Sequence, residues 1–142
     1  MAATFPEQLR RYSVALISLA VALSGLAYNT WRNERSEENK NTRTAGIEVL
    51  LLLGDLDQVV FHAHYDKDTV AGNPRTGWAM VLTIRDLGGL TMEPAISATR
   101  ELVQVWDANW AGLGHDDVQA QNIADAIERV RGDVLTVISK LD

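Results

Sequence analysis

Three histidines are the residues of this chain best suited to chemistry. His62 and His64 lie in the segment FHAHYDKD, and His115 lies in the segment GLGHDD. Imidazole and carboxylate groups together are ligands that zinc, copper and nickel accept. The sequence therefore predicts a candidate site for a divalent transition metal ion, with these ligands: His62, His64, Asp66, His115 and Asp116.

The spacing of the histidines restricts how such a site can form. His62 and Asp66 are four residues apart, as are His64 and Asp68, so each pair shares one face of a helix. His62 and His64 point about 200° away from each other on a helix of 3.6 residues per turn. These two histidines do not easily share one ion. The alternative is that the Asp and His residues simply occupy helix ends.

Other catalytic arrangements are not recognisable in the sequence. The chain has no cysteine, which excludes disulfides, thiolate metal sites and thiol catalysis. The segments LGGL and GLG indicate turns, and no serine is placed beside a histidine as a nucleophile. We expect a protein without enzymatic activity and without a cofactor other than the candidate metal ion.

The elements that would position the histidines are helices. After Thr44 the apolar residues recur in steps of three and four, which indicates amphipathic helices, and no stretch alternates convincingly with a period of two. The pattern is clearest in the last segment, where it comprises Ile123, Ile127, Val130, Val134, Val137 and Leu141.

Helix boundaries follow from capping and turn residues. Asn73 can cap a helix that has Pro74 at its first position, and Asp116 and Asp117 favour the start of the last helix. Glycines separate the helical segments between these points. We predict helices over residues 32–66, 74–88, 94–112 and 116–141, the first of them continuous with a membrane helix.

Short connections between four helices favour antiparallel neighbours. The sequence therefore predicts an all-α fold, an antiparallel up-down four-helix bundle. In that arrangement the first and third connections, near residues 67–73 and 112–116, lie at the same end, away from the membrane. The three histidines should then lie within roughly 15 Å of one another at this end.

A membrane helix is predicted over residues 12–31, which contain no charged residue. Twenty helical residues extend roughly 30 Å, the thickness of the hydrocarbon core of a bilayer. A cleaved signal peptide is the alternative, with Gly25-Leu26-Ala27 as its cleavage site. The residues that favour a retained span are charged or aromatic and lie at its two ends: Arg10, Arg11, Tyr12, Tyr28, Trp31 and Arg32.

The orientation of this span is less clearly encoded. A literal count of Lys and Arg on the two flanks favours a cytoplasmic C-terminal side. A short basic tail followed directly by an apolar core is instead typical of a signal-anchor. We expect the latter, in the bacterial inner membrane, with the C-terminal domain periplasmic. The predicted divisions are a tail (1–11), the transmembrane helix (12–31), a polar juxtamembrane stalk (32–43) and the bundle domain (44–142).

Charge is distributed unevenly along the chain. Residues 1–43 hold six basic and four acidic side chains, whereas residues 44–142 hold seven basic and fifteen acidic ones. An acidic domain is repelled by the phosphates of nucleic acids, so we expect no nucleic-acid partner.

The polar segment NTWRNERSEENKNTRT, residues 29–44, contains the stalk and has two interpretations. Charges of both signs suit a solvated helix that crosses the headgroup layer. Alternatively, the stalk and the neighbouring leucines contact another integral membrane subunit, which can be a second copy of the chain. The predicted partner contacts are Arg32, Asn33, Leu50, Leu51 and Leu53.

The layout of a basic tail, one span, YNTWRNERSEEN and an antiparallel bundle resembles the periplasmic four-helix sensor modules of bacterial chemoreceptors and sensor kinases. In those receptors a second span leads to a cytoplasmic output domain, whereas this chain stops at VLTVISKLD, so we expect a partner to carry any signal. We expect an accessory or interaction subunit of a larger inner-membrane assembly. The alternative is a sensor module that binds a metal or a ligand, with Trp78, Trp106 and Trp110 as a candidate aromatic pocket.

Overall fold

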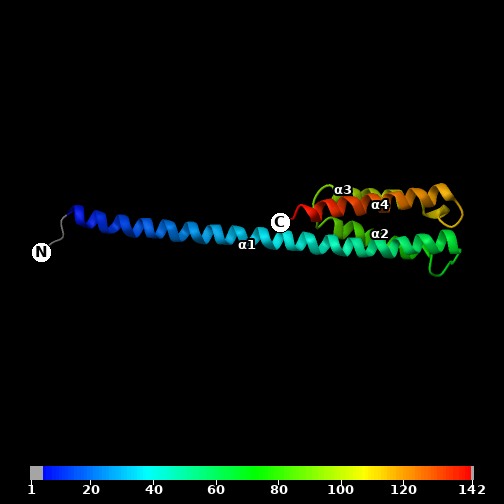
Figure 1. The fold of residues 1–142 in the computed structure, drawn as a ribbon, viewed down its shortest axis with the longest axis horizontal. Helices are drawn as coiled ribbons and strands as arrows, with labels where there is room; N and C mark the ends of the chain where they lie inside the picture. The colour runs from blue at the N-terminus through cyan, green and yellow to red at the C-terminus, as the bar shows by residue number, and fades with distance from the viewer. Residues whose placement is uncertain (1–4, 142) are drawn as a thin grey trace. The chain divides into compact units, whose positions relative to one another are not determined.

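The computed structural model describes residues 5–141, with side chains from residue 12 onward. No strand occurs within this range, so the predicted all-α class is confirmed there. Helix α1 covers Phe5–Phe61 and continues into a π-helical turn, η1 (His62–Asp66). The helices that follow are α2 (Pro74–Gly88), α3 (Ala95–Asn109), the 3-10 turn η2 (Trp110–Gly112) and α4 (Asp117–Ser139) (Figure 1).

The chain divides into two compact units, Met1–Glu38 and Asn39–Asp142. Helix α1 contributes its first part to one unit and its last part to the other. In the first unit the large apolar side chains are solvent-exposed, for example Leu19 at 56% and Val21 at 67%. The second unit, in contrast, encloses a hydrophobic core.

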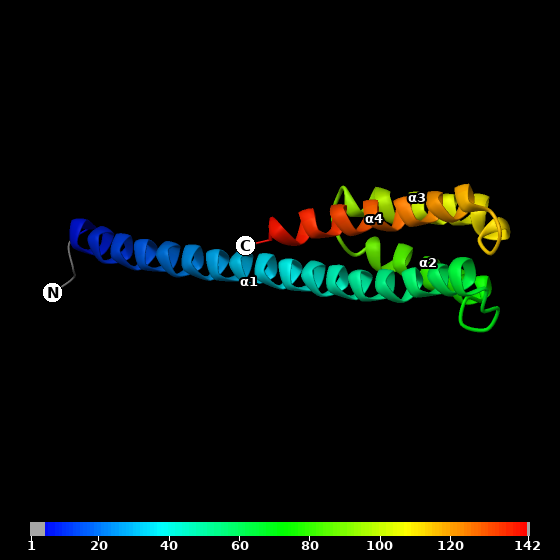
Figure 2. The same ribbon diagram turned by 45° about the vertical axis from the view of Figure 1, so that its right-hand side comes forward.

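The second unit is a helical bundle. Figures 1 and 2 show α4 and α2 alongside the last part of α1, with α3 alongside α4. Each helix contributes completely buried side chains to one core cluster, for example Leu53 of α1, Ile84 of α2, Leu102 of α3 and Ile127 of α4. The steps of three and four residues in the sequence produce this core, because they place the apolar residues of each helix on one face.

Glycines allow the helices of the bundle to pack closely. A Cβ atom on Gly77 of α2 would lie 2.2 Å from Cζ2 of Trp106 on α3, so only glycine leaves room for this buried indole. A Cβ on Gly46 of α1 would lie 3.0 Å from Cδ1 of Ile138 on α4. These contacts fix which faces of α2 and α3, and of α1 and α4, meet.

The helix ends largely follow the predicted capping residues. The Asn73 side chain accepts a hydrogen bond from Arg75 N, with Pro74 at the first helical position, as predicted. Helix α3, in contrast, begins at Ala95 and its N-cap, Pro94, provides no side-chain hydrogen bond. Its last predicted turn narrows into η2 after Asn109.

Two side-chain contacts connect the ends of α4 to α1 and η1. Arg43 Nη2 donates to the carbonyl of Leu141, 2.7 Å away, near the start of the bundle part of α1. Lys67 Nζ, just after η1, donates to the carbonyl of Gly114 at 2.8 Å. The bundle part of α1 and helix α4 therefore extend over the same length, and residues 67 and 114 lie at one end. We call this the histidine end, defined as residues 62–73 and 110–117.

Candidate functional site

The π-helical turn η1 begins the histidine end. Its backbone closes i→i+5 hydrogen bonds, which widen the helix and change the direction of the side chains that follow. The turn ends at Lys67, which has φ of 56°, a left-handed conformation uncommon for residues other than glycine. The backbone is therefore redirected directly after the predicted ligand Asp66.

His62 and Asp66 form a pair on the surface. His62 Nδ1 lies 2.7 Å from Asp66 Oδ2, and the two side chains are 38% and 46% exposed. The four-residue spacing in the sequence anticipated this pair. Exposed pairs of this kind contribute little to stability, because water solvates both partners.

His64 is buried, with an exposed fraction of 9%, and contacts two other segments of the histidine end. Its Nδ1 lies 3.0 Å from the carbonyl oxygen of Leu113, and its Nε2 lies 3.2 Å from Oδ1 of Asp117. A carbonyl oxygen only accepts hydrogen bonds, so Nδ1 carries a proton here. His64 thus connects η1 to the turn that precedes α4.

The predicted pairing of His64 with Asp68 is not observed. The left-handed residue Lys67 ends the helix first, so the four-residue spacing no longer places the two side chains on one face. Asp68 Oδ1 instead accepts hydrogen bonds from Val70 N at 2.8 Å and Ala71 N at 3.0 Å. These bonds, Ala71 first, hold the pKa of the Asp68 carboxyl below its ordinary value of 3.8, and the nearby His62 adds a smaller effect.

The remaining predicted ligands are Asp116 and His115. Asp116 Oδ1 caps α4 by accepting hydrogen bonds from Val118 N at 2.9 Å and Gln119 N at 3.1 Å. His115 is exposed. Among the described residues there is no group of three or more His, Asp or Glu side chains arranged to hold a metal ion. An ion at this end would therefore need His62, His64 or Asp116 to leave its present partner.

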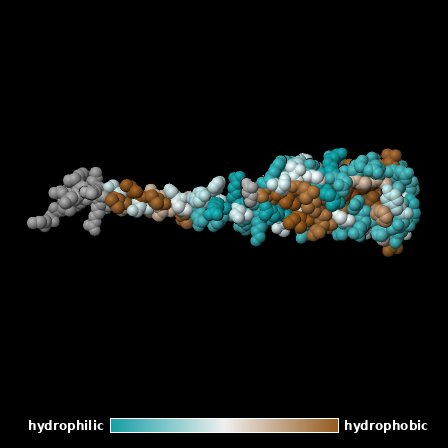
Figure 3. Space-filling model, viewed as in Figure 1, coloured by the Kyte–Doolittle hydropathy of each residue, from teal (hydrophilic) through white to brown (hydrophobic). Residues whose placement is uncertain are grey.

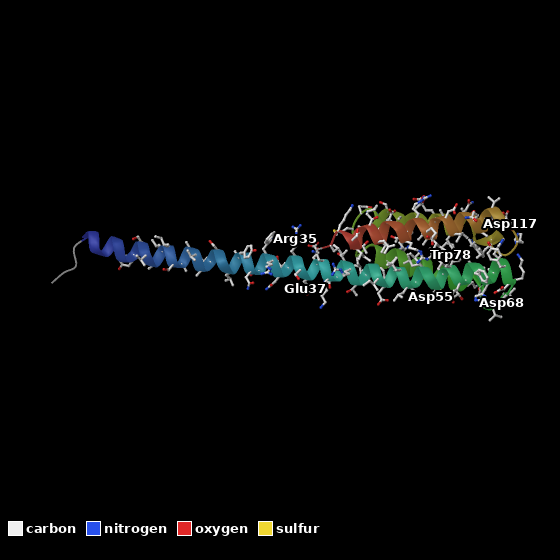
Figure 4. The ribbon with its side chains drawn as sticks, viewed as in Figure 1. Arg35, Glu37, Asp55, Asp68, Trp78 and Asp117 are labelled. Atoms are coloured by element: carbon white, nitrogen blue, oxygen red, sulfur yellow. The ribbon has the colours of Figure 1, made fainter. Side chains whose placement is uncertain are left out.

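A groove of about 740 Å³ lies between α1 and α4 and reaches the histidine end. Phe61 and Tyr65 line it with their ring centroids 5.2 Å apart, and both rings are more than half exposed. His64 and Asp117 also contribute to the lining. Figure 4 shows Asp117 at the same end of the bundle as Asp68. Asp117 was expected at this end from its place at the start of the last helix, but Phe61 and Tyr65 were not predicted, although their four-residue spacing is visible in the sequence.

The three tryptophans of the predicted aromatic pocket differ in burial. Trp106 is completely buried, and its Nε1 has no hydrogen-bond partner among the described residues. Trp78 is partly buried against the core, where Figure 4 labels it, and Trp110 is 38% exposed. Helical spacing places these side chains at different depths of the bundle.

In the first unit, α1 presents an apolar surface. Among the described residues one helix is long and apolar enough to cross a membrane, with an 18-residue window of mean hydropathy 1.5 that is not buried. Figure 3 shows this hydrophobic stretch and the hydrophilic stretch that follows it. At its end the Tyr28 and Trp31 rings are 6.1 Å apart, and the Arg35 guanidinium lies 5.9 Å from the Trp31 ring. Figure 4 labels Arg35 and Glu37 in the polar stretch. The side chains of Arg10 and Arg11 lie outside the described residues.

The predicted partner contacts differ in exposure. Arg32 and Asn33 are exposed, and Leu51 is 62% exposed. Leu50 packs partly against the core, and Leu53 is completely buried within it. Leu53 therefore serves the bundle itself and does not offer a contact to a partner, because its face of α1 is covered by the other helices.

Comparisons with protein-family models, with curated proteins and with solved structures gave no significant match. The functional interpretation therefore rests on the chain's own residues and their geometry.

Proposed function

We propose that this chain is a single-pass protein of the bacterial inner membrane. Its helical domain, residues 44–142, would act as a non-enzymatic accessory or interaction subunit of a larger membrane assembly. The observation that supports this proposal is the apolar part of α1, residues 12–31. Its large apolar side chains are more than half exposed, and no other part of the described chain buries them. Such a surface in water is unfavourable by about 25 cal/mol per Å² of apolar area.

The ends of this segment suit the two interfaces of a bilayer. Tyr12 lies at one end, and Tyr28, Trp31 and Arg35 lie at the other. Aromatic rings and long cationic side chains favour the headgroup region, where the rings are partly buried and the charges remain solvated. The proposed orientation has the N-terminus in the cytoplasm and the bundle, with its helices up, down, up and down, in the periplasm.

Purification from membranes tests the interaction role. A tagged full-length chain extracted in mild detergent should co-purify with a second membrane component in fixed stoichiometry. Leu102→Ala, which alters only the bundle core, should weaken this association if the folded domain makes the contacts. A monomer without any stoichiometric component would contradict the proposed role.

Reporter fusions test the orientation. A reporter that is active only in the periplasm, fused after Asp142, should be active. A cytoplasmic reporter at the same position should be inactive. The reverse pair of results would place the domain in the cytoplasm, as the simple Lys and Arg count suggests.

A sensor module is the second candidate function, and the groove between α1 and α4 is the observation that favours it. Exposed aromatic rings and the His64–Asp117 pair line one open space of ligand size. A ligand that binds only the folded state raises the melting temperature of the full-length protein in detergent. Tyr65→Ala should remove that shift, whereas Trp110→Ala, outside the groove, should retain it. A broad screen of small molecules and divalent ions without any shift would count against this function.

A further inference from the structure

An exposed stripe runs along α1 outside the bundle core, and three of its positions, Gly54, Gln58 and Phe61, also line the groove beside α4. In the second unit it includes Ile47, Leu51 and Phe61, which are 47%, 62% and 52% exposed. With Gly54 and Gln58 between them, these residues follow steps of four and three: 47, 51, 54, 58 and 61. The core residues of α1 follow the same spacing in a different phase, so the helix has two apolar stripes and the bundle covers only one.

The spacing of the exposed stripe is not interrupted toward the N-terminus. Counting back from residue 47 in steps of three and four gives 44, 40, 37, 33 and 30, and then 26, 23, 19 and 16. Residues 12–31 contain four leucines, and all four occupy this series: Leu16, Leu19, Leu23 and Leu26. Each of them is more than half exposed. An apolar repeat of 3.5 residues is the pattern by which two helices pack as a left-handed coiled coil.

We propose that this stripe is the contact surface for a second copy of the chain, and that the two α1 helices pack in parallel and in register. The parallel direction rests on the proposed membrane anchor, because two copies inserted in one membrane with one orientation cannot pack their spans antiparallel. A two-fold axis along the helices then places each stripe residue opposite the same residue of the other copy.

Charge complementarity supports the register. If the stripe residues occupy the a and d positions of a heptad, Arg43 is at a g position and Glu48 is at the e position five residues later. Parallel dimers place these two positions of different copies side by side, so the pair is attractive. Two heptads further along, Asp57 is at a g position and His62 is at the e position five residues later. Arg43 keeps donors for this contact, because its bond to Leu141 uses only one of five N–H groups.

Gly54 provides an independent observation. It lies on the stripe inside α1, where glycine costs roughly 1 kcal/mol relative to alanine. A Cβ atom at this position would meet no atom of the chain within 4 Å, so the chain's own packing does not require a glycine there. Gly25 and Gly132, which lie off the stripe, have equally open surroundings, so Gly54 is compatible with the close approach of a second α1 on this face but does not require it.

The stripe is polar between its two apolar runs, at Thr30, Asn33, Glu37, Lys40 and Thr44. Identical charges would face each other at Glu37 and at Lys40, which disfavours tight packing in this stretch. The proposed contacts therefore concentrate in the run of leucines at residues 16–26 and in the run from Ile47 to Phe61. The polar stretch in between helps to set the register rather than the strength of the dimer.

Single cysteines test this arrangement, because the natural chain contains none. Leu19→Cys and Leu51→Cys place one thiol on the stripe in the span and in the bundle, respectively. Val21→Cys and Leu135→Cys are matched controls off the stripe, with parent residues that are 67% and 50% exposed. In a parallel, in-register dimer each stripe thiol lies opposite the same thiol of the other copy, close enough to form a disulfide under mild oxidation.

The readout is non-reducing gel electrophoresis of oxidised native membranes. The two stripe variants should shift from 15.6 kDa to twice that mass, and the two controls should remain at 15.6 kDa. Equal cross-linking of all four variants would indicate random collisions and would overturn the proposal. So would the absence of a dimer at the stripe positions, or cross-linking at Val21→Cys in preference to Leu19→Cys.

Alkaline extraction of the same membranes separates this proposal from the proposed function. If the chain resists extraction but forms no stripe disulfide, the proposed anchor is supported and the proposed dimer is contradicted. If the chain is released by alkali but cross-links through Leu51→Cys, the proposed anchor is contradicted and the dimer contact in the bundle is supported.

Discussion

Helix α1 bears apolar side chains in two settings that differ in what covers them. In the bundle, Val49, Leu53 and Leu56 are completely buried under the other three helices. In the first unit, Leu16 and Leu23 are 65% and 57% exposed. The same residue type on the same helix is covered by the chain in one region and not in the other. The comparison teaches that apolar periodicity identifies a surface to be buried, but does not say what buries it.

The largest expected effect tests the covered region. Leu102→Ala removes a completely buried side chain and leaves a cavity, so the free energy of unfolding should fall by about 2–5 kcal/mol. Leu135→Ala, at a half-exposed position of α4, should change it by less than about 0.5 kcal/mol. Chemical denaturation of the full-length protein in micelles measures both values. Equal effects at the two positions would contradict the described core.

The next effect tests the uncovered region. Leu23→Arg places a charge near the centre of residues 12–31, where insertion into a bilayer becomes less favourable by about 2.5–3.5 kcal/mol. The fraction of the protein that resists alkaline extraction should fall sharply. Leu135→Arg is the control and should leave that fraction unchanged, because Leu135 lies in the bundle. Full membrane retention of Leu23→Arg would break the distinction between the two regions.

A smaller effect tests the histidine end of the bundle. His64→Gln should lower the free energy of unfolding by about 1–3 kcal/mol, because the buried carbonyl of Leu113 loses its donor. His115→Gln, at an exposed position, should have little effect. Thermal or chemical unfolding compares the two variants. A larger loss for His115→Gln would contradict the assignment of His64 as the connecting histidine.

The smallest effect concerns Asp68 and appears only as a pH dependence. Its pKa is lower in the folded protein than the ordinary value of 3.8, so the ionised carboxylate favours the folded state. This contribution is complete above pH 3.8 and disappears as the pH falls through the folded-state pKa. Asp68→Asn keeps an oxygen for the same turn but removes the charge. The stability difference between the wild type and Asp68→Asn should therefore shrink as the solution is acidified below pH 3.8.

Sequence reasoning predicted those parts of the fold that depend on neighbouring residues. Asn73 and Pro74 marked the start of α2, and Asp116 marked the start of α4, because capping is a contact within one turn. The end of α1 was predicted at residue 66, but the π-helical form of its last turn was not. Residues of that turn make long-range contacts, such as His64 with Leu113, which local spacing does not contain.

The candidate site was predicted less completely for the same physical reason. The pair of His62 with Asp66 follows from a four-residue spacing and was found. The partner of His64 is Asp117, more than fifty residues away in the sequence, so only the packing of η1 against the start of α4 reveals it. Leu50, Leu51 and Leu53 are consecutive or nearly so, yet only Leu51 is exposed, because each successive residue turns to another face of α1.

The most direct measurement of the central claim is the accessibility of single cysteines to a membrane-impermeant maleimide. In intact membranes Val21→Cys should not react until detergent dissolves the bilayer, because in the proposed arrangement lipid surrounds this part of α1. Leu135→Cys should react without detergent once its side of the membrane is exposed to the reagent. Because the natural chain has no cysteine, each signal reports one position. Reaction of Val21→Cys as rapidly as Leu135→Cys in intact membranes would show that residues 12–31 are not in the bilayer.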